Sequence, residues 1–189
     1  MSVRFASVVM AMAALPLFTA CGTSEATAQA TSTPSPYTAK ALASACEGRD
    51  GWNDPAPPAQ IYGNSWYVGT CGISAVLITS PDGHVLVDVG TAEAVPLIIA
   101  NIEKLGFSAE DIRVIVISHE HADHAGGLAE MQRITGASVA ASIPGAAVLK
   151  SGVPDADDPQ GGDLPPLSPA PIGWAVEDGE MLTYGDLDL

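Results

Sequence analysis

Basic residues are scarce in this chain of 189 residues: seven Lys and Arg stand against 22 Asp and Glu, which gives a net charge of −15. Nucleic acids and anionic membrane surfaces bind proteins through clusters of positive charge, so neither is an expected partner. Aromatic residues make up 5% and charged residues 15%, whereas hydrophobic residues reach 47%. This composition supplies a packed core within one domain and argues against general disorder.

No long hydrophobic run indicates a transmembrane segment, because the apolar run over residues 8–18 is too short to span a bilayer. Arg4 precedes this run and small residues follow it, so residues 1–30 are predicted to be a signal peptide that is cleaved near Ala30. Residues 18–21 resemble a lipobox, which leaves lipidation of Cys21 as the alternative. Both alternatives imply export, and the first predicts a periplasmic protein.

Cysteine is rare, with three residues in the chain. If Cys21 leaves with the signal peptide or carries a lipid, Cys46 and Cys71 remain as a pair in an oxidising compartment. A disulfide between them is the favoured interpretation, and two buried free thiols are the alternative. Their spacing does not match a thiolate zinc site.

The hydrophobic pattern predicts a β-rich first part that is followed by alternating strands and helices. The expected elements, in chain order, are a helix over 38–46, antiparallel strands over 60–68, 74–79 and 84–89, a helix over 92–105, a helical turn over 108–111, a strand over 113–117, a helix over 128–135 and a strand over 138–141. Strands that alternate with helices form βαβ units, so the predicted class is α/β.

The last part of the chain is rich in turn-forming residues. Residues 152–171 contain much Pro, Gly and Asp and are expected to form a long surface loop. Residues 172–176 and 181–184 are expected to pair as a hairpin across Asp178-Gly179. The alternating residues 185–189 are expected to begin a further strand.

Histidine is also rare, and three of the four histidines lie in an H-x-H-x-D-H motif at residues 119–124. The motif follows an apolar strand and precedes a helix, and α/β proteins place their sites at this edge of the sheet. In an extended segment His119 and His121 point the same way and can share one metal ion. Where the chain turns toward the helix, Asp123 and His124 can reach a second ion. Nitrogen and oxygen ligands of this kind favour zinc over magnesium or calcium.

A polar loop that happens to be rich in histidine is the alternative interpretation of this motif. The spacing of four potential ligands directly after a buried strand argues against that alternative. The fourth histidine, His84, is expected at the edge of a hairpin, facing solvent. Glu120, inside the motif, is expected to be solvated rather than catalytic.

The motif resembles the signature of the metallo-β-lactamase superfamily, whose fold is an αβ/βα sandwich with two zinc ions at the edge of the sheets. Four further stretches resemble subclass B3 β-lactamases in particular: residues 61–64, 71–74, 80–88 and 157–160. The motif alone is shared with glyoxalase II, lactonases and nucleases. The resemblance covers nearly all residues after the signal peptide, and it implies that residues 31–189 are the N-terminal half of such a sandwich.

Site roles follow from the resemblance. It implies that His119 and His121 bind the first zinc ion and that Asp123 and His124 bind the second, with Asp123 also orienting the attacking water. Asp88 matches a carboxylate that supports the metal-binding loop from outside, and a strand-end cap is the alternative. Trp52 resembles an aromatic residue that lines the substrate groove, and packing against the domain is the alternative.

The implied activity is zinc-dependent hydrolysis of the β-lactam ring, with a small-molecule antibiotic as the partner and a monomer as the complete enzyme. Zinc lowers the pKa of water toward about 7, so no Ser or Cys nucleophile is needed. Two alternatives stay open: another hydrolase of the superfamily, such as a lactonase, and an inactive metal-binding fragment.

The number of ligands indicates that the sequence is partial. Two catalytic zinc sites with three protein ligands each need six, and the motif supplies four. No histidine follows His124. In the relatives, a histidine follows the strand that ends near Leu189, and a later one completes the second site. Residues 31–189 alone are therefore expected to leave one face of the sheet uncovered and to lack activity.

Overall fold

The computed structural model describes residues 35–161 and 163–189. The predicted signal peptide, its cleavage site near Ala30 and the alternative lipidation site at Cys21 lie outside the described residues. Within the described ranges, no helix has both the length and the apolar character needed to cross a bilayer.

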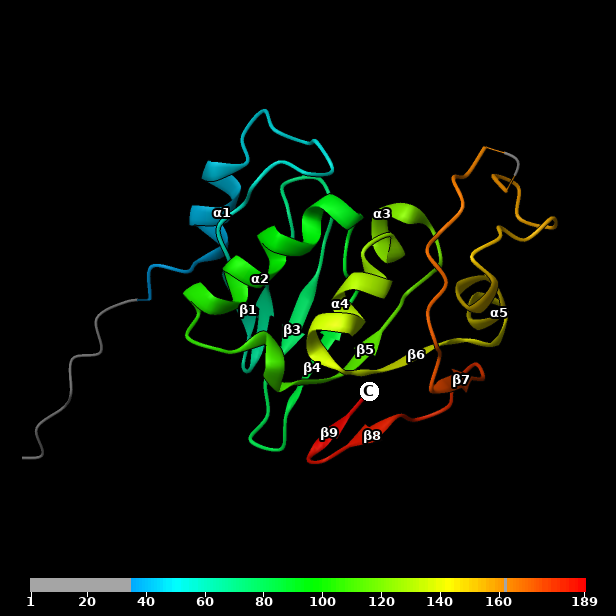
Figure 1. The fold of residues 1–189 in the computed structure, drawn as a ribbon. Helices are drawn as coiled ribbons and strands as arrows, with labels where there is room; N and C mark the ends of the chain where they lie inside the picture. The colour runs from blue at the N-terminus through cyan, green and yellow to red at the C-terminus, as the bar shows by residue number, and fades with distance from the viewer. Residues whose placement is uncertain (1–34, 162) are drawn as a thin grey trace, which may run out of the picture. The chain divides into compact units, whose positions relative to one another are not determined.

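A seven-stranded mixed sheet forms the centre of this part of the chain (Figure 1). In spatial order, which is also chain order, its strands are β1 (Ala59–Tyr62), β2 (Ser65–Tyr67), β3 (Val76–Ile78), β4 (His84–Val87), β5 (Ile112–Val116), β6 (Ser138–Ser142) and β7 (Trp174–Val176). Strands β1 to β4 pair antiparallel, and β4 to β7 pair parallel. The carboxyl ends of β4, β5 and β6 therefore meet at one edge of the sheet.

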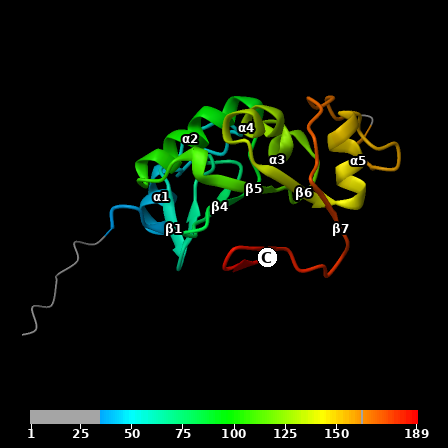
Figure 2. The same ribbon diagram turned by 60° about the horizontal axis from the view of Figure 1, so that its bottom comes forward.

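Helices connect the parallel strands. These are η1 (Ala92–Ala94), α2 (Val95–Lys104), η2 (Ala109–Asp111), α3 (Ala122–Ala125), α4 (Leu128–Thr135) and α5 (Ile143–Ser151). A further helix, α1 (Ala39–Ala45), precedes β1. Figure 2 shows α2 and α4 over one face of the sheet, while a separate hairpin, β8 (Thr183–Tyr184) with β9 (Leu187–Asp188), lies on the opposite side. The predicted α/β class is confirmed.

The core lies between the sheet and helices α2 and α4. Its largest members are at most 1% exposed: Leu77, Leu86, Ile98, Ile102, Ile112, Ile115, Leu128 and Met131. Each such side chain stabilises the fold by about 1.5–3 kcal/mol relative to an exposed position. Val114 and Ile115, successive residues of β5 whose side chains point to opposite faces of the sheet, are both fully buried. The strand that precedes the histidine motif is therefore firmly anchored in the core.

Several predicted elements have the expected positions. Helix α4 spans the predicted residues 128–135, and α1, α2, β4, β5 and β6 agree within a few residues. A disulfide joins Cys46 and Cys71, whose Cα atoms are 5.3 Å apart, as predicted. The free-thiol alternative is therefore excluded.

The single strand predicted over residues 60–68 is wrong. The chain reverses within it and forms the β1–β2 hairpin, in which Tyr62 pairs with Ser65. Gly63 at the turn has φ +52°, a backbone conformation that glycine adopts without a steric penalty.

The hairpin predicted between residues 172–176 and 181–184 is also wrong. Strand β7 pairs parallel with β6, where Ala141 faces Ala175, and so extends the large sheet. Residues Thr183–Tyr184 pair instead with Leu187–Asp188 across Gly185, whose φ is +57°. The backbone of β6 competes with residues 181–184 for hydrogen bonds to residues 174–176, and β6 binds them. Local turn residues do not reveal such a distant partner.

Two helices were not predicted. Helix α3 lies inside and just after the histidine motif, where no helix was expected before residue 128. Helix α5 begins at Ile143, and Pro144 fits its first turn. The Ser142 hydroxyl accepts a hydrogen bond from the Gly145 N–H at 3.2 Å. In contrast, the described residues of the 152–171 stretch contain no helix or strand, as expected for a loop.

Candidate metal centre

The histidine motif lies directly beyond the carboxyl end of β5 and crosses the end of β4. The Val89 N–H donates to the His124 carbonyl at 3.0 Å, and the Gly127 N–H donates to the Gly90 carbonyl at 2.9 Å. These two backbone hydrogen bonds fasten α3 to the end of β4, so the motif has a defined position relative to both strands.

Close packing explains why two glycines follow the motif. A Cβ atom on Gly127 would lie 2.4 Å from Val95 Cγ2 and 2.9 Å from the Thr91 carbonyl oxygen. One on Gly126 would lie 2.3 Å from the Ala122 carbonyl oxygen. Only glycine allows α3 to approach the N-terminal end of α2 this closely.

Asp88 links the end of β4 to the motif. Its carboxylate accepts hydrogen bonds from the Ser118 N–H (2.8 Å), the Ser118 hydroxyl (2.7 Å) and His124 Nδ1 (2.8 Å). Its side chain is 8% exposed, and its φ of +60° is the one positive φ of a non-glycine residue in the part of the chain that the structure describes. Asp tolerates this left-handed conformation better than most residues. The Asp88 side chain therefore bonds directly to Ser118 and to the histidine motif.

These hydrogen bonds set the ring tautomers. A carboxylate only accepts, so His124 Nδ1 carries the proton and Nε2 keeps its lone pair. The Ser118 hydroxyl gives its one proton to Asp88, so its oxygen accepts from His119 Nδ1 at 3.2 Å. His119 Nε2 is then also free to bind a cation.

Three of the predicted ligands come together. One ligand atom each from His119, Asp123 and His124 lies within 4.8 Å of the other two. His124 Nε2 is 3.4 Å from Asp123 Oδ2, and both atoms are acceptors. Two acceptors at this distance repel each other unless a cation lies between them. The nitrogen and oxygen donors suit zinc, so this set of residues fits the metal that the motif predicts.

His121, the fourth predicted ligand, does not join this set. Its ring centroid is 4.8 Å from that of His119, but its Nε2 is hydrogen-bonded at 2.7 Å to Asp158 Oδ2 in the long loop. The pKa of the Asp158 carboxyl is held below its usual value, first by the backbone N–H of Gln160 and then by the hydrogen bond from His121. Glu120 is partly buried beside Gly145 of α5 instead of fully solvated.

A cavity of about 520 Å³ adjoins the motif. Its lining includes Trp52, Thr91, Gly126 and Leu167, so it lies between the loop before β1 and the long loop after α5. Trp52 is 53% exposed, and its backbone carbonyl accepts a hydrogen bond from the Thr70 hydroxyl at 2.7 Å. The Trp52 ring therefore has space to contact a molecule in the cavity beside the histidine motif.

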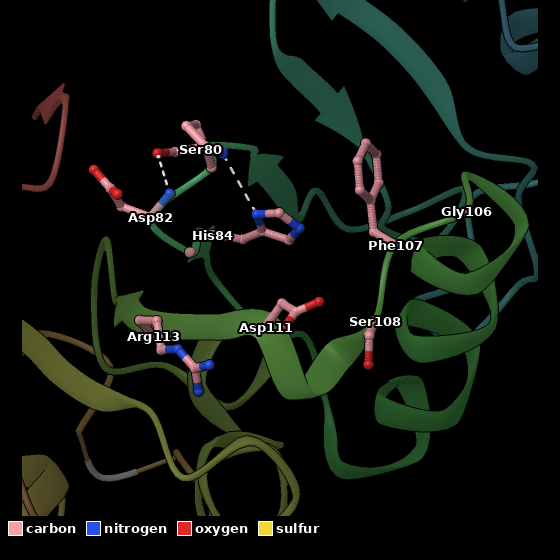
Figure 3. Close-up of a pocket in the computed structure, with 10 residues that line it drawn as sticks. Ser80, Asp82, His84, Gly106, Phe107, Ser108, Asp111 and Arg113 are labelled. Carbon is pink, nitrogen blue, oxygen red and sulfur yellow. Dashed lines mark hydrogen bonds between the residues drawn. The ribbon is translucent and has the colours of Figure 1, made fainter.

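A second hollow, also of about 520 Å³, lies at the N-terminal end of β5 (Figure 3). Its lining includes Asp111, which precedes the strand, and Arg113, the second residue of the strand. His84 lies on the wall of this hollow, and the solvent-facing position predicted for it is wrong. His84 is 8% exposed, and its ring packs edge-on against Phe107 with the ring centroids 5.1 Å apart. Its Nδ1 accepts a hydrogen bond from the Ser80 N–H at 3.4 Å. Burial lowers the pKa of His84.

Sequence reasoning missed two residues of this centre, Ser118 and Asp158. Ser118 immediately precedes the motif, and its position beside the first histidine was the available signal. Asp158 lies 37 residues after His121, and only its place in a stretch that resembles subclass B3 enzymes pointed to it.

The edge of the parallel strands of this α/β protein thus carries a His, Asp and His cluster that could hold a metal ion. Residues 68–188 match the family described as the metallo-beta-lactamase superfamily, and the chain belongs to this superfamily. Members of the superfamily are metal-dependent, and zinc is their typical metal.

Solved structures agree with this assignment. The chain is similar to the metallo-β-lactamase MIM-1 from Novosphingobium pentaromativorans, with 54% identity, a TM-score of 0.77, and coverage of 79% of this chain and 56% of that one. It is also similar to the metallo-β-lactamase MIM-2 (43% identity, TM-score 0.76, coverage 80% and 56%). A third relative is MEM-A1, a subclass B3 metallo-β-lactamase from a soil metagenome library (50% identity, TM-score 0.70, coverage 73% and 52%). The chain thus spans just over half the length of these relatives.

Proposed function

We propose that the whole protein is a zinc-dependent hydrolase of β-lactam antibiotics. One observation carries the proposal: His119, Asp123 and His124 present three ligand atoms within 4.8 Å, and Asp88 and Ser118 orient both imidazoles for metal binding. Similarity to enzymes named metallo-β-lactamases, at up to 54% identity, supports β-lactams as the substrate class.

The proposed centre holds two zinc ions. His119 and His121 would bind the first, and Asp123 and His124 the second. When bound, zinc supplies Lewis acidity and activates water at neutral pH. Asp123 is only 20% exposed, and its carboxylate would both bind metal and orient the water that attacks the lactam carbonyl.

The residues of the site favour attack by water over a covalent mechanism. Ser118 is the hydroxyl nearest to the motif, but its proton is donated to Asp88 and its oxygen accepts from His119. It has no spare basic partner that would activate it as a nucleophile. The cysteines of the described part are joined in the disulfide.

Substrate binding is assigned to the cavity beside the motif. Trp52 would contact the apolar part of a β-lactam, and residues 165–168 would form the facing wall. The substrate is the proposed partner, and the complete enzyme is proposed to be a monomer. We further propose export by the signal peptide over residues 1–30 to the periplasm, with lipidation at Cys21 as the alternative.

The test is hydrolysis of a chromogenic cephalosporin by the purified whole protein, with zinc and with a chelator. We expect zinc-dependent turnover that falls by orders of magnitude in His119→Ala and Asp123→Ala. Glu120→Gln is the matched control, because Glu120 lies in the same motif but outside the ligand set. An acyl-homoserine lactone assayed in parallel separates a lactonase: faster turnover of the lactone than of the cephalosporin would refute the proposal.

A further inference from the structure

The contact between His121 and Asp158 joins two segments that are far apart in the sequence. His121 Nε2 lies 2.7 Å from Asp158 Oδ2, and their side chains are 20% and 15% exposed. The hollow beside them has a volume of about 10 Å³, room for about one water molecule, and Val148 and Leu167 contribute to its lining. This contact is therefore largely shielded from solvent, unlike an ordinary surface ion pair.

Asp158 is itself held in place by its loop. Its Oδ1 accepts the Gln160 N–H at 2.7 Å, its backbone N–H donates to the Asp155 carbonyl at 3.2 Å, and its carbonyl accepts from the Gly161 N–H at 2.9 Å. Because both carboxylate oxygens have a defined donor, the carboxylate has one orientation toward His121.

That orientation determines which His121 nitrogen can bind a metal. A carboxylate only accepts, so the proton of neutral His121 lies on Nε2 and the lone pair lies on Nδ1. At His124 the two ring nitrogens have the opposite roles, because Asp88 accepts a hydrogen bond from Nδ1 and leaves Nε2 free. Each of the two carboxylates would thus prepare one histidine of the motif, from opposite sides.

We propose that Asp158 is a positioning residue of the metal centre, which holds His121 by Nε2 and leaves Nδ1 as its metal-binding atom. This inference rests on the proposed function, since it assumes that His121 binds zinc. It also makes the long loop after α5 part of the metal centre, because a displacement of Asp158 would release the ring of His121. Carboxylate partners of this kind change metal affinity by roughly 10–100-fold.

The experiment compares three variants of the whole protein without substrate. Asp158→Ala removes the acceptor, Asp158→Asn keeps an acceptor oxygen without the charge, and Asp157→Asn removes a charge from the neighbouring exposed residue. Zinc affinity is measured by competition with a chromogenic chelator. The His121 tautomer is read from long-range ¹H–¹⁵N spectra of the metal-free protein at about pH 8.5, where imidazole is neutral.

We expect zinc affinity to fall about 10–100-fold in Asp158→Ala, to fall less in Asp158→Asn, and to stay unchanged in Asp157→Asn. The Nε2–H tautomer should dominate in the unmodified protein and in Asp158→Asn, and should lose its dominance in Asp158→Ala. A folded Asp158→Ala protein with unchanged zinc affinity and tautomer would overturn the proposal. If Asp158→Ala does not fold, Asp158→Asn decides: a partial loss of zinc affinity supports the proposal, and unchanged affinity refutes it.

These measurements separate the two proposals. A protein that shows the expected zinc and tautomer changes but does not hydrolyse β-lactams would refute the proposed function alone. An active β-lactamase in which Asp158→Ala changes neither quantity would refute the role of Asp158 alone.

Discussion

Replacing Asp88 with Asn should weaken metal binding much more than it weakens the fold. Asn tolerates a φ of +60°, and its amide oxygen can still accept the Ser118 N–H. Its NH₂ group, however, would meet the Nδ1–H of His124, and two donors repel. The ring then escapes the clash by moving its proton to Nε2, which removes the lone pair beside Asp123.

The magnitude follows from the three hydrogen bonds that Asp88 accepts. Loss of an outer carboxylate costs about 10–100-fold in metal affinity, which corresponds to about 1.4–2.7 kcal/mol. For folding, hydrogen bonds to a charged group contribute about 1.5–3 kcal/mol each, but removal of a buried charge offsets part of that loss. We therefore expect a decrease of about 1–3 kcal/mol in the free energy of unfolding of metal-free Asp88→Asn.

Asp88→Gly provides the comparison. Glycine adopts the same φ but accepts none of the three hydrogen bonds, so it should lose more stability than Asn does. Zinc affinity from chelator competition, and unfolding in urea without metal, measure the two quantities independently. An Asp88→Asn protein with unchanged zinc affinity, or one in which His124 keeps its proton on Nδ1, would refute this reasoning.

Three further predictions concern the stability of the fold. Because burial lowers the pKa of His84, the neutral imidazole is favoured in the folded state. The stabilisation should therefore be full above the unfolded pKa of about 6.5 and decrease as the pH falls below that value. In urea titrations between about pH 7.5 and 5, His84→Asn should lose less stability than the unmodified protein. An equal decrease in both proteins would contradict this. Gly127→Ala should lose about 1–3 kcal/mol, because its Cβ would lie 2.4 Å from Val95 Cγ2, and unchanged urea unfolding would show that α3 can shift at no cost. Reduction of the disulfide between Cys46 and Cys71, which are 25 residues apart, should lower the free energy of unfolding by about 3 kcal/mol, whereas a Cys46→Ser/Cys71→Ser protein should not respond to reductant.

Local sequence patterns were sufficient to predict those helices and strands whose position depends only on their own residues and immediate neighbours. Helix α4 has its predicted ends, because its apolar period and the glycine that follows it are both local. The clustering of His119, Asp123 and His124 was also predictable, because they lie within six consecutive residues at the end of an apolar strand. The pairing of Cys46 with Cys71 followed from the small number of cysteines.

The hydrogen bonds that orient the histidine side chains required the tertiary structure, although the family resemblance had already pointed to Asp88. Asp88 is 36 residues from His124, and Asp158 is 37 residues from His121, so each contact depends on how distant segments meet at the sheet edge. The same reason explains the pairing of β7 with β6 and the burial of His84. A sequence pattern records how far each residue type favours burial or a turn, but it does not record which distant backbone or side chain satisfies a given hydrogen bond. That choice is made only when the sheet assembles and the competing partners are brought within reach of one another.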